Sequence, residues 1–306
     1  MTLRDSISLL RPYHWVKNVF ALAALVFSGQ WTQPESAALA GLAFAAFCLL
    51  SSATYVINDM VDVREDRAHP RKRHRPLAAG RMLGWQAALL GAGCLSGGLV
   101  LCALVGSQLL AVGVAFMVLQ LLYSFWLKGH VLLDVMCIAF GFVLRAFAGG
   151  MAIGVPVSLW LLAGTFALCM FLGFGKRRCE MAELGGELHT GKHRQTLSSY
   201  TVPLLDRLLN ISAGVAIVTY ILYTVDPATV AKIGTPALFF SSPLVVYCVF
   251  RFAMLVEGGH INEPMEALSD VPFLTVLALW VIYCAGAVTW GPALEQYVGT
   301  SGLLER

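Results

Sequence analysis

Residues 36–56, SAALAGLAFAAFCLLSSATYV, and the polar run NDMVDVREDR at residues 58–67 decide the fold. The first stretch has no charged side chain and is about 20 residues long, the length that an α-helix needs to cross a bilayer core. The second stretch is rich in carboxylates and arginines, so the apolar helix ends where a polar surface begins. We therefore expect a membrane-spanning helix that carries a charged group of residues at one end.

The same apolar pattern repeats along the chain. Hydrophobic residues make up 58% of the sequence and charged residues only 13%, whereas soluble domains carry about 25% charged residues. The apolar runs are continuous, unlike the alternating strands of membrane β-barrels, so helices are predicted. We predict an all-α, polytopic membrane protein that forms a single integral-membrane domain over residues 1–306. About nine transmembrane helices are expected, approximately at residues 18–31, 36–56, 84–105, 108–126, 131–153, 156–175, 208–225, 235–255 and 271–290, of which the first is the weakest.

Basic residues are distributed unevenly between the two sides of the membrane. With the N-terminus placed in the cytoplasm, every Lys and Arg lies in a cytoplasmic segment except Lys232, Arg306 and the mid-span Arg145. This asymmetry follows the positive-inside rule and predicts a cytoplasmic N-terminus and, with an odd number of spans, an external C-terminus. No small-residue cleavage site follows a short apolar core near the N-terminus, so no cleavable signal peptide is expected.

The carboxylates that follow the second span predict a metal site. If the helix continues, Asn58, Asp59, Asp62 and Asp66 fall within an arc of about 100°. Carboxylates grouped at a membrane surface are costly unless a cation lies between them. Oxygen ligands on one helix face suit Mg2+, which typically binds one or two carboxylates together with substrate phosphates. We predict these four residues as metal ligands, with Asp59 the weakest; the alternative is a solvated helix end whose acids pair with neighbouring arginines.

The next segment, HPRKRHRPLAAGR at residues 69–81, predicts a phosphate-binding loop. Its two prolines disfavour a helix. Arginine forks bind phosphate oxygens in pairs, and Lys72 can bind them as a point charge. A metal cluster beside a basic loop indicates a substrate with at least two phosphate groups. For any single residue of the loop, a role in membrane topology alone stays an open alternative.

Further polar residues lie at or near the same ends of the predicted spans. Arg145 lies in the middle of the fifth span, where a charged side chain is a functional candidate by default. A structural pairing of Arg145 with another helix explains its position equally well. The residues at the cytoplasmic span ends are Lys17, Tyr123, Lys128, Asp134, Lys176, Arg177 and Arg251.

Several of these stretches resemble the UbiA superfamily of intramembrane prenyltransferases. The spacing NDxxDxxxD at residues 58–66 and the sequence RPLAAG at residues 75–80 carry the resemblance. That superfamily has nine transmembrane helices around a central cavity. Within it, the chain is similar to the branch that transfers phosphoribose to decaprenyl phosphate. The similar stretches lie within residues 11–270 and include RPYHWVKN at 11–18, DRAHPRKRHRPLAAG at 66–80, LDVMCIAFGFVLRAFAGG at 133–150, GKRRCE at 175–180 and RFAMLVEGG at 251–259.

The resemblance implies a reaction and a location. The donor would be 5-phosphoribosyl diphosphate (PRPP), the acceptor a polyprenyl phosphate such as decaprenyl phosphate, and the leaving group diphosphate, with Mg2+ as cofactor. In bacteria with arabinan cell walls this step feeds arabinofuranose donors for cell-wall biosynthesis. The protein would then lie in the bacterial inner membrane, with its active site facing the cytoplasm.

The same resemblance implies which residues act. A metal neutralises the charge of a leaving diphosphate, and the anionic acceptor needs no general base. The expected partners are the two substrates and membrane lipids, with no nucleic acid. Small residues such as Gly91 and Gly98 suit close helix packing within one chain or in a homo-oligomer. The implied catalytic residues are Asn58, Asp62 and Asp66, and the substrate-binding candidates are Lys17, Arg67, Lys72, Arg75, Tyr123, Lys128, Arg145, Lys176, Arg177 and Arg251.

Two alternative functions stay open. An aromatic prenyltransferase of the same superfamily would use a polyprenyl diphosphate donor, and it normally has a second aspartate-rich motif between spans six and seven. This chain has KRRCEMAELGGELHTGKHR there, at residues 176–194, which contains three glutamates but no DxxxD and is strongly basic. That composition favours an additional phosphate to bind. A secondary transporter would show internal repeats and a midplane site, and no clear repeat relates the two halves.

Overall fold

The computed structural model describes residues 2–68, 72–183 and 197–298. Within these residues the chain consists of α-helices and short 3-10 segments, without strands. Eight helices of the described chain are long and apolar enough to cross a membrane, so this is a multi-pass membrane protein. The chain divides into two compact units. Among the described residues, the first unit comprises residues 2–24, 33–68 and 72–156, and the second comprises residues 25–32, 157–183 and 197–298.

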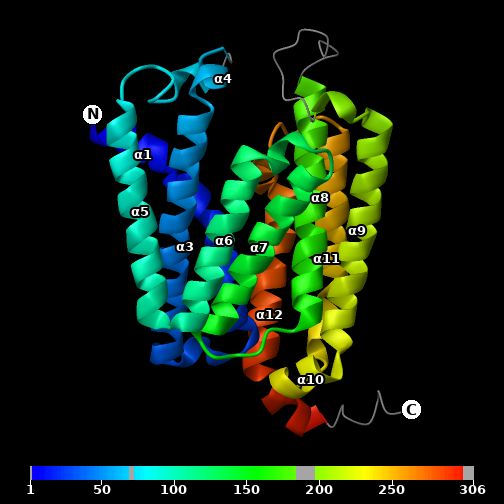
Figure 1. Cartoon of the computed structure of the whole chain (residues 1–306). Coiled ribbons are helices and arrows are strands. Elements are labelled where there is room, and N and C mark those ends of the chain that lie inside the picture. Colours follow the sequence, from blue (N-terminus) through cyan, green and yellow to red (C-terminus); the bar gives the residue numbers. More distant parts are fainter. Residues whose placement is uncertain (1, 69–71, 184–196, 299–306) are drawn as a thin grey trace. The chain divides into compact units, whose positions relative to one another are not determined.

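The first unit is organised around α3 (Pro34–Val61). This helix contacts α5 (Gly84–Val105), α6 (Ser107–Phe125) and α7 (Leu133–Ala152), and the four helices run side by side in Figure 1. Their shared interior is apolar and filled by small and aromatic side chains. The buried core residues here are Ala43, Ala46, Phe47, Leu50, Cys102, Leu109, Val112, Phe116, Met117, Ala148 and Ala152.

Glycine permits the close approach of α5 to α3. A Cβ atom at Gly98 would lie 2.8 Å from the Leu50 side chain and 3.1 Å from the carbonyl oxygen of Ala46. Small residues of this kind allow helix backbones to approach closely in membranes, where dispersion contacts replace the hydrophobic effect as the main packing force. Gly98 therefore contributes to helix packing inside the chain.

The predicted first span at residues 18–31 is wrong as a continuous helix. The chain there forms a 3-10 helix (Pro12–Leu22), which follows α1 (Leu3–Leu10), and then the short α2 (Ala23–Phe27). The prediction from hydropathy took no account of Asn18. This residue is fully buried, and its side chain forms hydrogen bonds inside the protein. The 3-10 helix lies against α7 at Gly149, where any Cβ would overlap a backbone carbonyl oxygen of the 3-10 helix.

The second unit contains the remaining long helices. α8 (Leu159–Glu183) packs along α9 (Val202–Val225), and α11 (Ser242–Glu257) contacts α8, α9 and α12 (Val271–Val298). α8 continues past its predicted end at residue 175 and carries the basic run that follows. Short segments join these helices, among them α10 (Pro227–Ile233) and a 3-10 helix (Pro264–Ser269).

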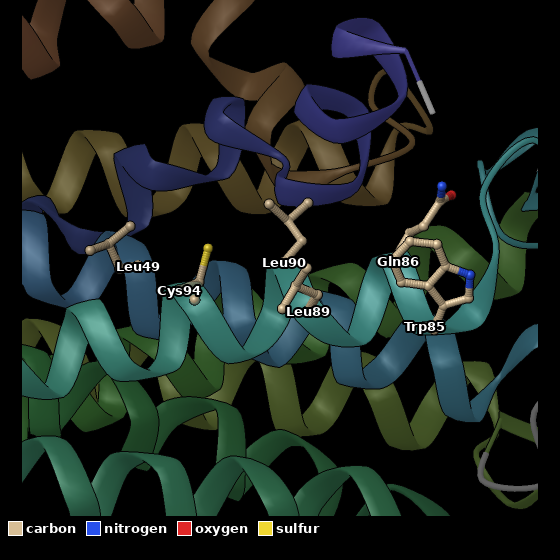
Figure 2. A pocket seen from close by; sticks show the side chains of 7 residues that line it. Leu49, Trp85, Gln86, Leu89, Leu90 and Cys94 are labelled. Atoms are coloured by element: carbon tan, nitrogen blue, oxygen red, sulfur yellow. The ribbon is translucent and has the colours of Figure 1, made fainter.

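An apolar hollow lies on the first unit, between α5 and one residue of α3. Figure 2 shows the side chains that line it, and its volume is about 550 Å³. None of the predicted site residues contributes to it. Its lining consists of Leu49, Trp85, Gln86, Leu89, Leu90, Gly93 and Cys94.

Candidate functional site: an acidic helix end paired with basic side chains

The acidic motif lies where α3 passes into α4 (Val63–Ala68). The predicted continuous helix is interrupted at Asp62, whose backbone (φ −93°, ψ 11°) leaves the helical region. Helical spacing is nevertheless kept, because the Asp62 amide donates to the Asn58 carbonyl at 2.9 Å and the Asp66 amide donates to the Asp62 carbonyl at 2.8 Å. Asn58, Asp62 and Asp66 therefore follow one another on successive turns.

Two of the predicted phosphate-binding residues lie against this acidic motif. Lys128 Nζ is 2.6 Å from Asp62 Oδ1. Arg75 Nη1 is 2.7 Å from Asp66 Oδ2 and 3.1 Å from Asp59 Oδ1, so one nitrogen bridges two carboxylates. The side chains of Lys128 and Arg75 are each 27% exposed, which leaves both cations accessible from the solvent side.

Arg11 belongs to the same cluster, although the pattern of the sequence did not single it out as a site residue. Its Nη2 donates a hydrogen bond to Asp59 Oδ1, and its guanidinium lies 5.2 Å from the centre of the Tyr55 ring. The Arg11 backbone has φ 51° and ψ 57°, in the left-handed region that non-glycine residues rarely adopt. The available signal was its place at the start of RPYHWVKN, directly before Pro12.

The oxygen donors of the motif fit a magnesium ion in part. Within the residues that the structure describes, no group of three His, Cys, Asp or Glu side chains is arranged around a common metal position. Asp59 is only 2% exposed and its Oδ1 accepts from two guanidinium groups, so it fits poorly as a ligand. The carbonyl and carboxylate oxygens of Asn58, Asp62 and Asp66 are the hard donors that Mg2+ prefers, and few protein ligands suffice when substrate phosphates complete the shell.

Arg145 lies inside the first unit and contacts protein groups on several sides. Its side chain is buried, with Nε 2.6 Å from Asn18 Oδ1, Nη1 2.9 Å from the Gly141 carbonyl oxygen and Nη2 3.2 Å from Ser51 Oγ. Two phenylalanine rings of α6 and α7 flank the guanidinium at 4.6 and 5.0 Å. This geometry favours the structural pairing; the predicted substrate role of Arg145 stays a prediction.

The other predicted residues of the first unit lie around the same end of its helices. Arg67 Nε donates to the carbonyl oxygen of Ala78 at 3.3 Å, which ties α4 to the basic loop. Lys72 is exposed at the start of a short 3-10 helix, as expected for a loop that contains two prolines. Lys17 is half-buried in the first 3-10 helix, and Tyr123 is half-buried near the end of α6.

In the second unit, Arg251 forms a two-bond pair with Asp270. Arg251 Nε and Nη2 lie 3.0 and 2.7 Å from the two carboxylate oxygens of Asp270, and this carboxylate also accepts from the Phe273 amide at the start of α12. The hydrogen bond from Arg251 lowers the pKa of Asp270 below its usual value, and burial opposes this shift. The pair joins α11 to the residue that precedes α12.

The basic run at the end of α8 is also paired with carboxylates. Arg177 is 2% exposed and its Nη1 contacts Glu180 Oε2, while Lys176 Nζ lies 4.0 Å from the other oxygen of Glu180. Arg178 Nε is 2.8 Å from Asp206 Oδ1 on α9. Of the two predicted substrate-binding residues here, Lys176 is the accessible one, with 43% of its side chain exposed.

Comparison with known proteins gives a consistent result. The model of the UbiA prenyltransferase family matches residues 18–267. A decaprenyl-phosphate phosphoribosyltransferase of Mycolicibacterium smegmatis is 34% identical over 288 residues, which cover 90% of this chain and 89% of the relative. The protein of the same name from Corynebacterium glutamicum is 36% identical over 287 residues, with 91% and 84% covered. A UbiA homolog from Archaeoglobus fulgidus, solved with DMAPP and Mg2+, has a similar fold with a TM-score of 0.72 at 18% identity, covering 93% of this chain and 99% of that one.

Proposed function

Because the chain belongs to the UbiA prenyltransferase family, as its motifs predicted, we propose that it is a membrane phosphoribosyltransferase. It transfers the 5-phosphoribosyl group of PRPP to decaprenyl phosphate and releases diphosphate. The observation that carries the proposal is the similarity, over about nine-tenths of the chain, to two bacterial proteins named for this activity. In a bacterium the chain would lie in the inner membrane.

The acidic motif and its basic partners supply what the reaction needs. Asn58, Asp62 and Asp66 would hold Mg2+, and the bound ion would lower the cost of charge on the leaving diphosphate. Arg75 and Lys128 already lie at this motif, within 2.7 Å of its carboxylates, so their N–H groups reach the oxygens of a diphosphate bound there. Placement and charge, rather than covalent chemistry by a side chain, therefore account for catalysis.

The chemical step itself is a displacement at the anomeric carbon. An oxygen of the acceptor phosphate forms a bond to this carbon while the bond from the carbon to the diphosphate oxygen breaks. The acceptor oxygen is already anionic, so no side chain has to remove a proton. The basic groups hold the two anionic reactants close to each other. Free in solution, two anions repel each other and rarely meet in the geometry that the reaction needs.

The charge pattern supports a cytoplasmic location of the site. In the first unit, Arg11, Arg75 and Lys128 all meet the polar end of α3. In short loops, Lys and Arg concentrate on the cytoplasmic side of membrane proteins. PRPP is a water-soluble metabolite of the cytoplasm, and the acidic motif at this end of α3 is positioned to receive it there.

The basic end of α8 favours this function over an aromatic prenyltransferase. In the described part of that region, Lys176 and Arg177 stand where the alternative function would need a second aspartate-rich motif. The remainder of the region, residues 184–196, lies outside the described residues. Basic side chains suit the additional 5-phosphate that PRPP carries and that a prenyl diphosphate lacks.

The test is a transfer assay with the purified full chain. PRPP labelled in its ribose, decaprenyl phosphate and Mg2+ are incubated with and without EDTA, and label is counted in the organic phase. Label that enters the organic phase only when Mg2+ is present is expected. No transfer of ribose, together with prenylation of an aromatic acceptor from a polyprenyl diphosphate, would replace this function by the alternative.

A further inference from the structure

We infer that Arg11 and Asp59 are positioning residues that hold Arg75 at the diphosphate site, and that Asp59 is not a metal ligand. This inference rests on the proposed function only in so far as a diphosphate group binds at the acidic motif. Both PRPP and a prenyl diphosphate carry such a group. The roles of Arg11 and Asp59 are therefore the same whichever of these two donors binds.

Asp59 is buried at the end of α3. Its side chain is 2% exposed, and its Oδ1 accepts hydrogen bonds from Arg11 Nη2 and from Arg75 Nη1. A buried carboxylate is strongly destabilised unless cations or donors compensate its charge. The two guanidinium groups supply that compensation, so Asp59 acts as an anion that gathers two arginines.

Arg75 is held in place by two carboxylates. Its Nη1 lies between Asp59 Oδ1 at 3.1 Å and Asp66 Oδ2 at 2.7 Å. Its Nε and Nη2 form no hydrogen bond with the residues that the structure describes, and the side chain is 27% exposed. One edge of the guanidinium is therefore fixed by carboxylates, and the other edge is available to the oxygens of an anion.

Arg11 is held in a turn of fixed conformation. Its backbone has a left-handed conformation between α1 and the 3-10 helix, which is unfavourable for a residue with a Cβ. The strained turn is stabilised by neighbouring contacts: the Ser52 hydroxyl donates to the Leu10 carbonyl at 2.9 Å, and Trp15 Nε1 donates to Ser52 Oγ at 3.0 Å. Strained backbone that persists in this way is concentrated at functional sites.

These contacts form one chain of charges from Arg11 through Asp59 and Arg75 to Asp66. Loss of Arg11 or of Asp59 releases Arg75 from its position, although neither residue needs to touch a substrate. A metal-ligand role for Asp59 makes a different prediction, since loss of a ligand changes the requirement for Mg2+. The two roles can therefore be separated by measuring diphosphate binding and Mg2+ dependence independently.

The experiment measures binding of 32P-labelled inorganic diphosphate to the full chain in detergent by equilibrium dialysis at several Mg2+ concentrations. We expect Arg11→Gln and Asp59→Asn each to weaken diphosphate binding at saturating Mg2+ by about tenfold, the effect of one charge-assisted hydrogen bond. The Mg2+ concentration at half-maximal binding should stay unchanged in both variants. In Asp62→Asn that concentration should rise.

A double-variant comparison isolates action through Arg75. Arg75→Gln alone should weaken diphosphate binding, and adding Arg11→Gln to it should weaken binding no further, because the positioned group is already gone. Arg178→Gln is the matched control: Arg178 is 16% exposed against 15% for Arg11, and it also pairs with an aspartate, but in the second unit. Its diphosphate binding should equal that of the original chain.

Several results would overturn the inference. Weakening by Arg11→Gln that adds in full to that of Arg75→Gln would show independent roles, and a raised Mg2+ requirement in Asp59→Asn would make Asp59 a ligand. If Arg11→Gln does not fold, Arg11→Lys, which keeps a donor and the charge, must restore folding and bind diphosphate within about threefold of the original chain; tenfold weaker binding there contradicts the inference. Failure of the ribose transfer assay alone would leave these outcomes readable, because inorganic diphosphate is the probe.

Discussion

Replacement of Arg145 by methionine should destabilise the protein even without any substrate. Methionine is uncharged and shorter than arginine but similar in volume, so the change removes three hydrogen bonds, to Asn18, Gly141 and Ser51, and keeps much of the volume. Polar contacts between membrane helices are worth about 0.6–1.7 kcal/mol each, which applies to the bonds with Asn18 and Ser51. The bond to the Gly141 carbonyl lies within α7 and adds about 0.5–1.5 kcal/mol. Together the three bonds give about 2–5 kcal/mol.

The lower end of this range is the better value. The side-chain oxygen Oδ1 of Asn18 still accepts from the Ser51 hydroxyl at 3.2 Å, so Arg145→Met does not leave this oxygen unpaired. Removing the buried charge also removes its desolvation cost. We therefore expect a loss of about 2 kcal/mol, which at an unfolding entropy of about 2.1 cal/mol/K per residue corresponds to a fall in Tm of about 3 °C for this chain of 306 residues.

The assay is thermal unfolding in detergent without ligands. Arg178→Met serves as control because it breaks an ion pair whose aspartate is exposed to solvent, worth about 0–1 kcal/mol, and should change the Tm by much less. An unchanged Tm in Arg145→Met, combined with lost binding of PRPP, would refute the structural role and support the alternative that Arg145 contacts substrate.

Three other changes test separate parts of the structure. Asp62→Asn should abolish ribose transfer while the chain still folds, whereas Glu65→Gln on the exposed side of α4 should keep transfer; normal transfer in Asp62→Asn would remove the residue from the metal site. The depressed pKa of Asp270 means that the Arg251 pair stabilises the folded state above the unfolded pKa of about 4 and that this stabilisation is lost as the pH falls through the folded value. Asp270→Asn should therefore flatten the acid limb of a stability–pH curve, and an unchanged limb would contradict the assignment. Gly149→Ala should destabilise the chain by several kcal/mol, measured by its Tm, because the new methyl group overlaps a backbone carbonyl oxygen; a normal Tm would show that the 3-10 helix can move away.

Local periodicity was sufficient to predict the helical spacing of the acidic motif. Asn58, Asp62 and Asp66 are spaced by one helical turn, and that spacing survives the break between α3 and α4 because the backbone hydrogen bonds continue across it. The apolar runs likewise predicted the all-α fold, since a bilayer requires about 20 residues of continuous hydrophobicity per helix. Both inferences depend only on neighbours along the chain.

Contacts between distant segments could not be predicted in this way. Asp59 falls within the same arc as the other acids, but it faces Arg11, which lies 48 residues away in the sequence, and Lys128 reaches Asp62 across 66 residues. Asn18 reads as a polar residue at the edge of an apolar run, and only its tertiary partners explain why it is buried. Hydropathy measures composition, whereas burial of a polar side chain depends on the donor or acceptor that the fold brings to it.

The distribution of charge explains how the acidic motif can persist at the end of a membrane helix. Among the described contacts, Asp59, Asp62 and Asp66 are balanced by Arg11, Arg75 and Lys128. A bound divalent cation would give this cluster an excess of positive charge, which a diphosphate can neutralise. Metal and diphosphate should therefore each bind more tightly in the presence of the other, because the coupling free energy between two sites is reciprocal.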